Sequence, residues 1–234
     1  MFDYSKNNVC ILNVSCGGWY PRGQHRLFES LDQFGFKGKK LFWKDRFPPG
    51  CPDHKKIPYA FKPYAFLEAK RRGYDIALWI DSALWAIKPI DYYLDKILKD
   101  GHVLLNNGWK TGQWCSDAAL KTLRITREEA MDMPHLMANV MGLDFRNKRS
   151  IDFFEEWFRL SNDGITFPGS WTNKNNEVSK DPRVLGHRHD QTAASVISIR
   201  LGMNWTIDNT GVFYYDGRPM EQVPSNIILL ARGM

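Results

Sequence analysis

The chain has 234 residues, 43% of them hydrophobic, which is enough for one substantial core but short for two independent domains. No apolar run is long enough to span a bilayer or to form a signal peptide, so we predict a single domain over residues 1–234, without a transmembrane segment and located in the cytoplasm. The four cysteines show no Cys-x-x-Cys spacing, which argues against a zinc finger and a disulfide scaffold.

The net charge of +6 is unevenly distributed along the chain. Residues 37–72 carry eleven Lys or Arg against three acidic residues, a local excess of +8. Such a stretch suits an anionic partner, whether a nucleotide diphosphate, a lipid headgroup or nucleic acid, and it is equally compatible with a solvated surface. The 9 Trp and 14 Phe exceed what a core of this size needs, which favours an aromatic pocket for a sugar or a base.

Residues 9–105 alternate short apolar runs with stretches of helical periodicity. The run 74–80 is apolar throughout, as a strand buried on both faces would be. A proline at position 58 is typical of a helix start. The pattern predicts strands at 9–14, 40–43, 74–80 and 102–105, and helices at 22–34, 58–72 and 89–98.

The later part of the chain is less regular. The spacing of apolar residues predicts helices at 126–131, 150–160 and 189–200 and short strands at 203–207 and 212–215, with an apolar stretch over 134–141. Residues 162–186 have no periodicity, and we predict a flexible loop there. Strands alternating with helices predict an α/β fold with a mostly parallel central sheet flanked by helices, and ligands bind beyond the carboxyl ends of such strands.

The strongest local feature is an acid placed directly after the most apolar predicted strand, in the run Trp79-Ile80-Asp81-Ser82-Ala83. It resembles the strand end of retaining GT-A glycosyltransferases, Rossmann-like enzymes in which an Asp-x-Asp motif holds a divalent metal on the diphosphate of a nucleotide sugar. The resemblance implies that Asp81 and Ser82 contact the donor and that Asp81 binds Mn²⁺ or Mg²⁺, since hard cations take oxygen ligands. Ala83 stands where the family has its second acid, so Asp81 could instead hold a sugar or ribose hydroxyl, or merely cap the next turn.

A second feature lies at the start of the predicted helix 189–200, in the run from Gly186 to Thr192. It resembles the Asp-Gln element with which these families begin a late helix in the donor site. The resemblance implies that Asp190 and Gln191 lie near the reacting carbon, with His187 and His189 as further metal ligands. Arg188 would be a phosphate partner, because its guanidinium offers a rigid fork of donors. The alternative is that Asp190 only caps the helix and that both histidines lie at the surface.

The remaining predicted contacts rest on their position in the family's order of motifs. Lys62 lies on the helix that precedes the acidic strand end, where it would meet the diphosphate. Val14 and Ser15 end the first strand, where base and ribose bind in nucleotide-binding sheets. The resemblance places Asn139 on the acceptor side, where we also expect Trp171. Residues 9–105 would then form the nucleotide-sugar half and residues 106–215 the acceptor and catalytic half.

These features together predict a glycosyltransferase, with a retaining outcome implied by the resemblance, that uses a UDP- or GDP-sugar and an acceptor glycan or other hydroxyl. One alternative keeps the enzyme and makes the acceptor a hydroxymethylated pyrimidine in DNA, since the basic stretch and the aromatics suit an extruded base. A nucleic-acid-binding protein without activity ranks below it, because no binding motif is present. An inactive transferase is a further alternative, given Ala83.

Overall fold

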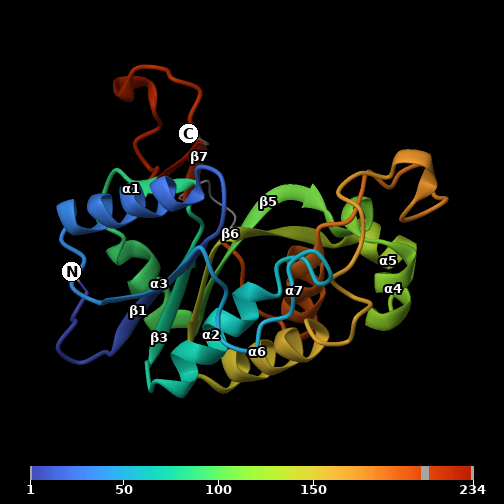
Figure 1. The fold of residues 1–234 in the computed structure, drawn as a ribbon, viewed down its shortest axis with the longest axis horizontal. Helices are drawn as coiled ribbons and strands as arrows, with labels where there is room; N and C mark the ends of the chain where they lie inside the picture. Colours follow the sequence, from blue (N-terminus) through green and yellow to red (C-terminus); the bar gives the residue numbers. More distant parts are fainter. Residues whose placement is uncertain (1, 207–210, 233–234) are drawn as a thin grey trace.

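The computed structural model describes residues 2–206 and 211–232. Its centre is a five-stranded sheet with helices on both faces (Figure 1). In spatial order the strands are β2 (Lys39–Lys44), β1 (Val9–Ser15), β3 (Ile76–Ile80), β6 (Pro134–Asp144) and β5 (His102–Lys110). The predicted α/β class is therefore confirmed.

The prediction of a mostly parallel sheet is wrong, because the sheet is mixed. Strand β1 pairs in parallel with β2 and β3, whereas β6 is antiparallel to both β3 and β5. The segment between β5 and β6 forms the short helices η1 (Thr111–Trp114), α4 (Asp117–Leu123) and α5 (Arg127–Asp132), which lie beyond the strand ends (Figure 1). Since this connection does not cross a face of the sheet, the chain returns antiparallel.

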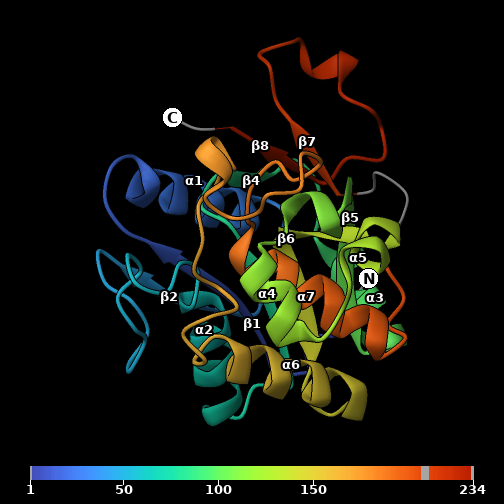
Figure 2. The same ribbon diagram turned by 90° about the vertical axis from the view of Figure 1, so that its right-hand side faces the viewer.

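Both faces of the central strands are buried, which is why their sequences are apolar throughout. In β3, Ala77 and Trp79 pack into one core and Ile76, Leu78 and Ile80 into the other. The first core is covered by α2 (Phe61–Arg71), α6 (Lys148–Leu160) and α7 (His189–Arg200), and the second by α1 (Tyr20–Gln33) and α3 (Asp91–Asp100). Figure 2 looks onto α4, α6 and α7, which lie side by side.

A second, small sheet adds the end of the chain to the domain. Its order is β4 (Leu84–Ala86), β8 (Leu229–Ala231) and β7 (Val212–Tyr214), and β4 begins three residues after Asp81. The short helix η3 (Met220–Gln222) lies between β7 and β8. This sheet brings the C-terminal segment next to the end of β3. Within residues 2–206 and 211–232, no helix is both long enough and apolar enough to cross a membrane.

The predicted elements agree with the structure at most positions, with ends that shift by a few residues. The helix at 189–200 is confirmed in full, and the strand at 102–105 extends to Lys110. The apolar stretch 134–141 is the long strand β6, and β4, α4 and β8 were not predicted. The predicted strand at 203–207 is reduced to one bridge between Thr206 and Leu105, and residue 207 lies outside the described residues.

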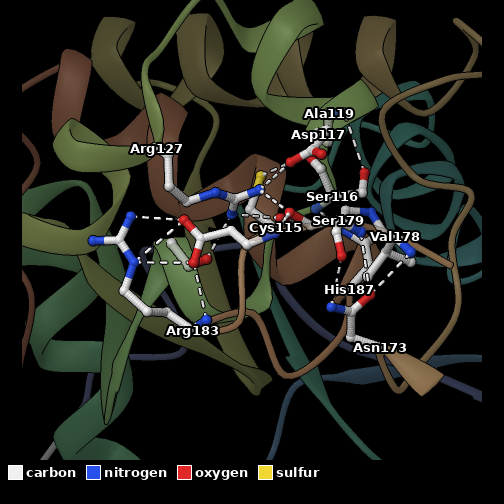
Figure 3. A network of polar contacts seen from close by, with 12 residues as sticks. Cys115, Ser116, Asp117, Ala119, Arg127, Asn173, Val178, Ser179, Arg183 and His187 are labelled. Atoms are coloured by element: carbon white, nitrogen blue, oxygen red, sulfur yellow. Dashed lines mark hydrogen bonds and ion pairs between the residues drawn. The ribbon is translucent and has the colours of Figure 1, made fainter. Parts of the chain in front are cut away.

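The segment predicted as a flexible loop, residues 162–186, has little regular structure beyond η2 (Lys174–Asn176) but makes many polar contacts. Figure 3 shows the network that joins it to α4 and α5. Arg127 donates to Ser179 Oγ, Arg183 pairs with Glu128, and the backbone N–H of Asp117 donates to the Val178 carbonyl. The segment is thus anchored in this structure, and its movement during function stays a prediction.

Candidate functional site

Two adjoining cavities open at the carboxyl ends of β1 and β3, where the rule for α/β sheets places ligands. The smaller, of about 250 Å³, is lined by Val14 and Ser82. Most of its other walls are aromatic: Trp19, Tyr20, Phe47, His54, Tyr59, Phe61 and Trp79. Trp19 and Tyr20 stack with ring centroids 4.4 Å apart.

The larger cavity, of about 470 Å³, shares Tyr59 and Asp81 with the smaller one. Its walls are more polar and come mainly from the other side of the sheet. Besides Asp81, seven predicted site residues line it: Lys62, Asn139, Trp171, Arg188, His189, Asp190 and Gln191. The structure therefore brings the motif residues of β3, α2, β6 and α7 to one place.

Asp81 lies at the junction of the two cavities and is held in one orientation. Its Oδ1 accepts a hydrogen bond of 2.6 Å from Trp79 Nε1, and its backbone N–H donates to the carbonyl of Asn139. The backbone N–H of Leu84 donates to the Asp81 carbonyl, which turns the chain from β3 into β4. About 33% of the Asp81 side chain stays exposed, so the carboxylate can meet a ligand.

Lys62, predicted to meet the diphosphate, is buried at the centre of the site. Its side chain is 4% exposed, and its Nζ donates to the carbonyl of Ala138 at 2.7 Å. The same Nζ lies 3.2 Å from Asp190 Oδ2 and 3.6 Å from Asp81 Oδ1. Burial lowers the pKa of Lys62, but the two carboxylates outweigh burial and hold the pKa above its ordinary value. One cation thus joins two carboxylates.

Asp190 is in the first turn of α7 and is 2% exposed. Burial raises its pKa to about 6, although Lys62 acts in the opposite direction. Its Oδ2 makes the ion pair with Lys62 but has no hydrogen-bond partner of good geometry. The prediction that Asp190 only caps a helix does not describe this arrangement, because its side chain faces a cavity and a buried ammonium.

The two histidines of the motif are buried and held in opposite tautomers. His187 Nδ1 accepts from the backbone N–H of Ser116, so its Nε2 carries the proton and donates to the Thr166 carbonyl. His189 Nδ1 faces the carbonyl of Phe167 and must donate, which leaves its buried Nε2 as an acceptor without a partner. Burial lowers the pKa to about 3 for His187 and about 4 for His189, so both are neutral at physiological pH.

This donor set does not form a metal site by itself. His187 has no free lone pair, and the Lys62 ammonium occupies the space between Asp81 and Asp190. Within the described parts of the chain, no three His, Cys, Asp or Glu side chains group closely enough to hold a metal ion. Asp81 and His189 Nε2 are the predicted ligands that keep an oxygen or nitrogen able to meet one.

Arg188, predicted to contact phosphate, is stacked between two indoles. Its guanidinium lies 4.0 Å from the ring centroids of both Trp114 and Trp171, and its Nη1 donates to the Trp171 carbonyl. Trp114 stacks in turn on Trp109, with centroids 4.8 Å apart. Trp109, Trp171 and Arg188 all line the larger cavity.

The two residues predicted at the end of β1 behave differently. Val14 lines the smaller cavity, whereas Ser15 lines neither cavity and its buried Oγ has no partner. Ser82 Oγ donates to Asn13 Oδ1 at 2.9 Å, which ties the end of β3 to β1.

Several residues that line the site were not predicted, among them Tyr59, Asn107, Trp109 and Tyr214. Tyr59 has φ +61°, a left-handed conformation that costs a non-glycine residue about 1–3 kcal/mol and is found often at functional sites. Tyr214 reaches the cavity from β7 at the far end of the chain. The surplus of aromatic residues was the only sequence signal for Tyr59, Trp109 and Tyr214, and Asn107 had none.

Comparisons with known proteins place the fold. No protein family model and no curated protein sequence matches the chain. A glycosyltransferase involved in the glycosylation of the major capsid of PBCV-1 has a similar structure, with 12% identity, a TM-score of 0.50, and coverage of 95% of this chain and 91% of that chain. The WbbM bifunctional glycosyltransferase, in its apo structure, aligns over 88% of this chain and 40% of that chain at 12% identity, with a TM-score of 0.49. The first likeness shows that this chain has the fold of a glycosyltransferase, as the resemblance implied.

Proposed function

We propose that the protein transfers a sugar from a nucleotide diphosphate sugar to a hydroxyl group of an acceptor. The observation that carries this proposal is the arrangement of Asp81, Lys62 and Asp190 at the junction of an aromatic cavity and a polar one. A donor of this class has an aromatic base at one end, a sugar at the other and a charged diphosphate between them. The two cavities and the charged residues at their junction match that order.

In this proposal the nucleotide occupies the smaller cavity and the sugar enters the larger one. The base packs on the aromatic walls near Trp19 and Tyr20, which offer stacking surface for any base. The diphosphate lies at the junction near Asp81. The sugar then faces Asp190, whose carboxylate pairs with Lys62 and lines the larger cavity, where it can meet developing charge.

Catalysis follows from position and electrostatics. The acceptor oxygen bonds to the anomeric carbon as the bond from that carbon to the diphosphate breaks. The diphosphate leaves with the bonding electron pair and takes up the proton of the acceptor hydroxyl, while positive charge develops at the anomeric carbon in the transition state. The Asp190 carboxylate stabilises the positive charge, and the buried Lys62 holds both carboxylates in place before the reaction starts. Fixed groups in a site shielded from water need no reorganisation, so they act more strongly than the same groups in solution. We propose a retaining outcome, which the anomeric configuration of the product tests by NMR.

A divalent metal is a separate part of the proposal. Mn²⁺ or Mg²⁺ would find one partly exposed carboxylate here, Asp81, and would need phosphate oxygens of the donor to complete its coordination. The described side chains alone do not complete a metal site. The roles proposed above for Asp190 and Lys62 therefore do not depend on a metal ion. Transfer assayed in EDTA and in Mn²⁺ distinguishes a metal-assisted site from one in which Lys62 is the principal cation.

The test is release of free nucleotide from UDP-, GDP-, CMP- and dTDP-sugars, followed by mass spectrometry. We expect turnover of one nucleotide class by the wild type and its loss in Asp81→Ala and Asp190→Ala, both of which should keep the fold. Asp152→Ala on the outer surface of α6 is the matched control and should be fully active. Full activity of both site variants would overturn the assignment of the site.

A further inference from the structure

A row of stacked rings forms one wall of the larger cavity. Trp171, the Arg188 guanidinium, Trp114 and Trp109 follow one another at stacking distances of 4.0 to 4.8 Å. Trp171 also contacts the rings of Tyr59 and His189, so the row begins beside the junction of the two cavities. Trp109 and Trp171 remain 42% and 49% exposed, which leaves large apolar surface open to a ligand.

The strand that carries Trp109 is distorted at this wall. The pairing of β5 with β6 shifts register between Leu104 and Leu105 and again between Asn106 and Lys110. Such irregularities redirect side chains and are common beside active sites. They flank Asn107 and Trp109, the two β5 residues that line the cavity.

Two side chains that line the cavity have buried acceptor atoms without a donor. They are Asn139 Oδ1 and His189 Nε2, which have no hydrogen-bond partner among the described residues. A buried acceptor without a partner costs free energy that a ligand hydroxyl can recover. Exposed indole rings beside hydrogen-bond acceptors without a partner suit a molecule that has an apolar C–H face and hydroxyl groups, as a carbohydrate ring has.

Away from the junction that takes the diphosphate, the larger cavity has one lining cation to offer a nucleic-acid backbone. Lys62 lies at the junction and is paired with Asp81 and Asp190, and Arg188 is stacked between two indoles. Basic residues of the 37–72 stretch line a separate groove along β2, among them Lys40, Lys44, Arg46 and Arg72. Strands β2 and β5 are opposite edges of the sheet, about 19 Å apart at four spacings of about 4.8 Å. The basic groove along β2 is therefore too far away to bind the phosphates that flank an extruded DNA base in the larger cavity. Those phosphates would have to be bound by residues at the mouth of the cavity.

We infer that the Trp109–Arg188–Trp171 wall is the acceptor site and that it binds a neutral carbohydrate ring, stacked on the exposed indoles and donating hydroxyl hydrogen bonds to Asn139 and His189. The inference deepens the proposed function and rests on it, because the donor takes the aromatic cavity and Asp190 takes the donor sugar. It also separates the two acceptors that the sequence left open, since it favours a glycan over a DNA base.

The experiment uses the full chain and three sets of probes. Saturation-transfer NMR measures binding of methyl α- and β-glycosides of glucose, galactose and mannose to the wild type, Trp109→Ala, Trp109→Phe and Phe42→Ala. Phe42, 45% exposed on β2, is the matched control for loss of an exposed ring. Gel shift measures binding of a duplex containing hydroxymethylcytosine, and thermal shift measures binding of nucleotide diphosphates. Near-UV circular dichroism verifies that each variant is folded.

We expect at least one glycoside to bind the wild type, Trp109→Phe and Phe42→Ala, and to bind Trp109→Ala about tenfold more weakly. Nucleotide binding should be equal in all four proteins. Absence of glycoside binding, equal binding by all four proteins, or binding of the DNA that is lost in Trp109→Ala would each overturn the inference. Glycoside binding that needs Trp109 without any nucleotide shift would uphold the carbohydrate site and sink the proposed transferase function.

Discussion

The two sides of the central sheet contribute to the site in different ways. On the β2-β1-β3 side the strands are parallel, and site residues lie at their carboxyl ends: Val14 is the next-to-last residue of β1, and Asp81 directly follows β3. On the β6-β5 side the strands are antiparallel and long, and site residues such as Asn107 and Asn139 lie within them. On the parallel side, the end of a strand determines where a site residue lies. On the antiparallel side, the position of a site residue is determined by the pairing register of the strands and by segments distant in the chain.

The charged centre joins the two sides, and removing it should have the largest effect. Lys62→Met leaves Asp81 and Asp190 without their shared cation, and removing one member of a buried charge group costs about 3–5 kcal/mol. We expect the free energy of unfolding in urea to fall by about that amount and transfer to be lost. Lys70→Met, an exposed lysine of the same helix, is the control. Equal stability of the two variants would mean that Lys62 does not hold the site together.

Replacing the two carboxylates one at a time tests whether Asp81, at the end of a parallel strand, and Asp190, on α7, have different roles. Asp190→Asn should lower kcat by about 10²–10³, because one fixed group that stabilises transition-state charge has about that effect. Asp81→Asn, at the end of the parallel strand, should instead raise KM for the donor. Steady-state kinetics with the donor varied distinguishes these patterns, and the opposite pattern would exchange the proposed roles.

The activity should depend on pH through Asp190. Because its pKa is raised to about 6 and the carboxylate is the form that meets positive charge, the reactive form is lost as pH falls through that value. We expect kcat to decrease about tenfold for each pH unit below about 5.5. The profile of Asp190→Asn should be flat over the same range. A wild-type rate that is constant from pH 7 to pH 4.5 would show that protonation of Asp190 does not matter.

The smallest expected effect concerns the segment of residues 162–186, which Arg127 helps to anchor beside α4 and α5. Arg127 donates to two backbone carbonyls, to Asp117 and to Ser179 Oγ in that segment, and its side chain is 12% exposed. Arg127→Ala should lower the free energy of unfolding by about 2 kcal/mol, since hydrogen bonds to charged groups contribute about 1.5–3 kcal/mol. Hydrogen exchange should increase in residues 173–185 and leave β1 and β3 unchanged. Unchanged exchange in that segment would show that its anchoring lies elsewhere.

The sequence predicts the parallel part of the central sheet better than the antiparallel part. Strand β3 and Asp81 are visible because a run buried on both faces and an acid at its end are local patterns. The helix at Asp190 is visible for the same reason. The direction of β6 is not, because periodicity records which residues are buried and not which way a strand runs. The antiparallel pairing of β6 therefore could not be predicted from its apolar sequence.

The roles of individual site residues depended on contacts between distant segments. The position of Lys62 predicts a contact with the diphosphate, but not the two carboxylates that β3 and α7 place beside it. Arg188 looks like a free phosphate ligand until Trp114 and Trp171 enclose it, 74 and 17 residues away in the chain. Tyr214 joins the cavity only through the small C-terminal sheet. None of these contacts has a local sequence signal.

The most direct test of the central claim is a thermal-shift panel with UDP, GDP, CMP and dTDP, each with Mn²⁺ and with EDTA. A ligand that binds only the folded state raises the melting temperature. At a hundredfold excess over its Kd it adds about 2.7 kcal/mol to the free energy of unfolding. We predict a shift of several degrees with one nucleotide diphosphate, and a smaller shift in Asp81→Asn. No shift with any of the four nucleotides would contradict the assignment of the aromatic cavity to the donor and, with it, the proposed function.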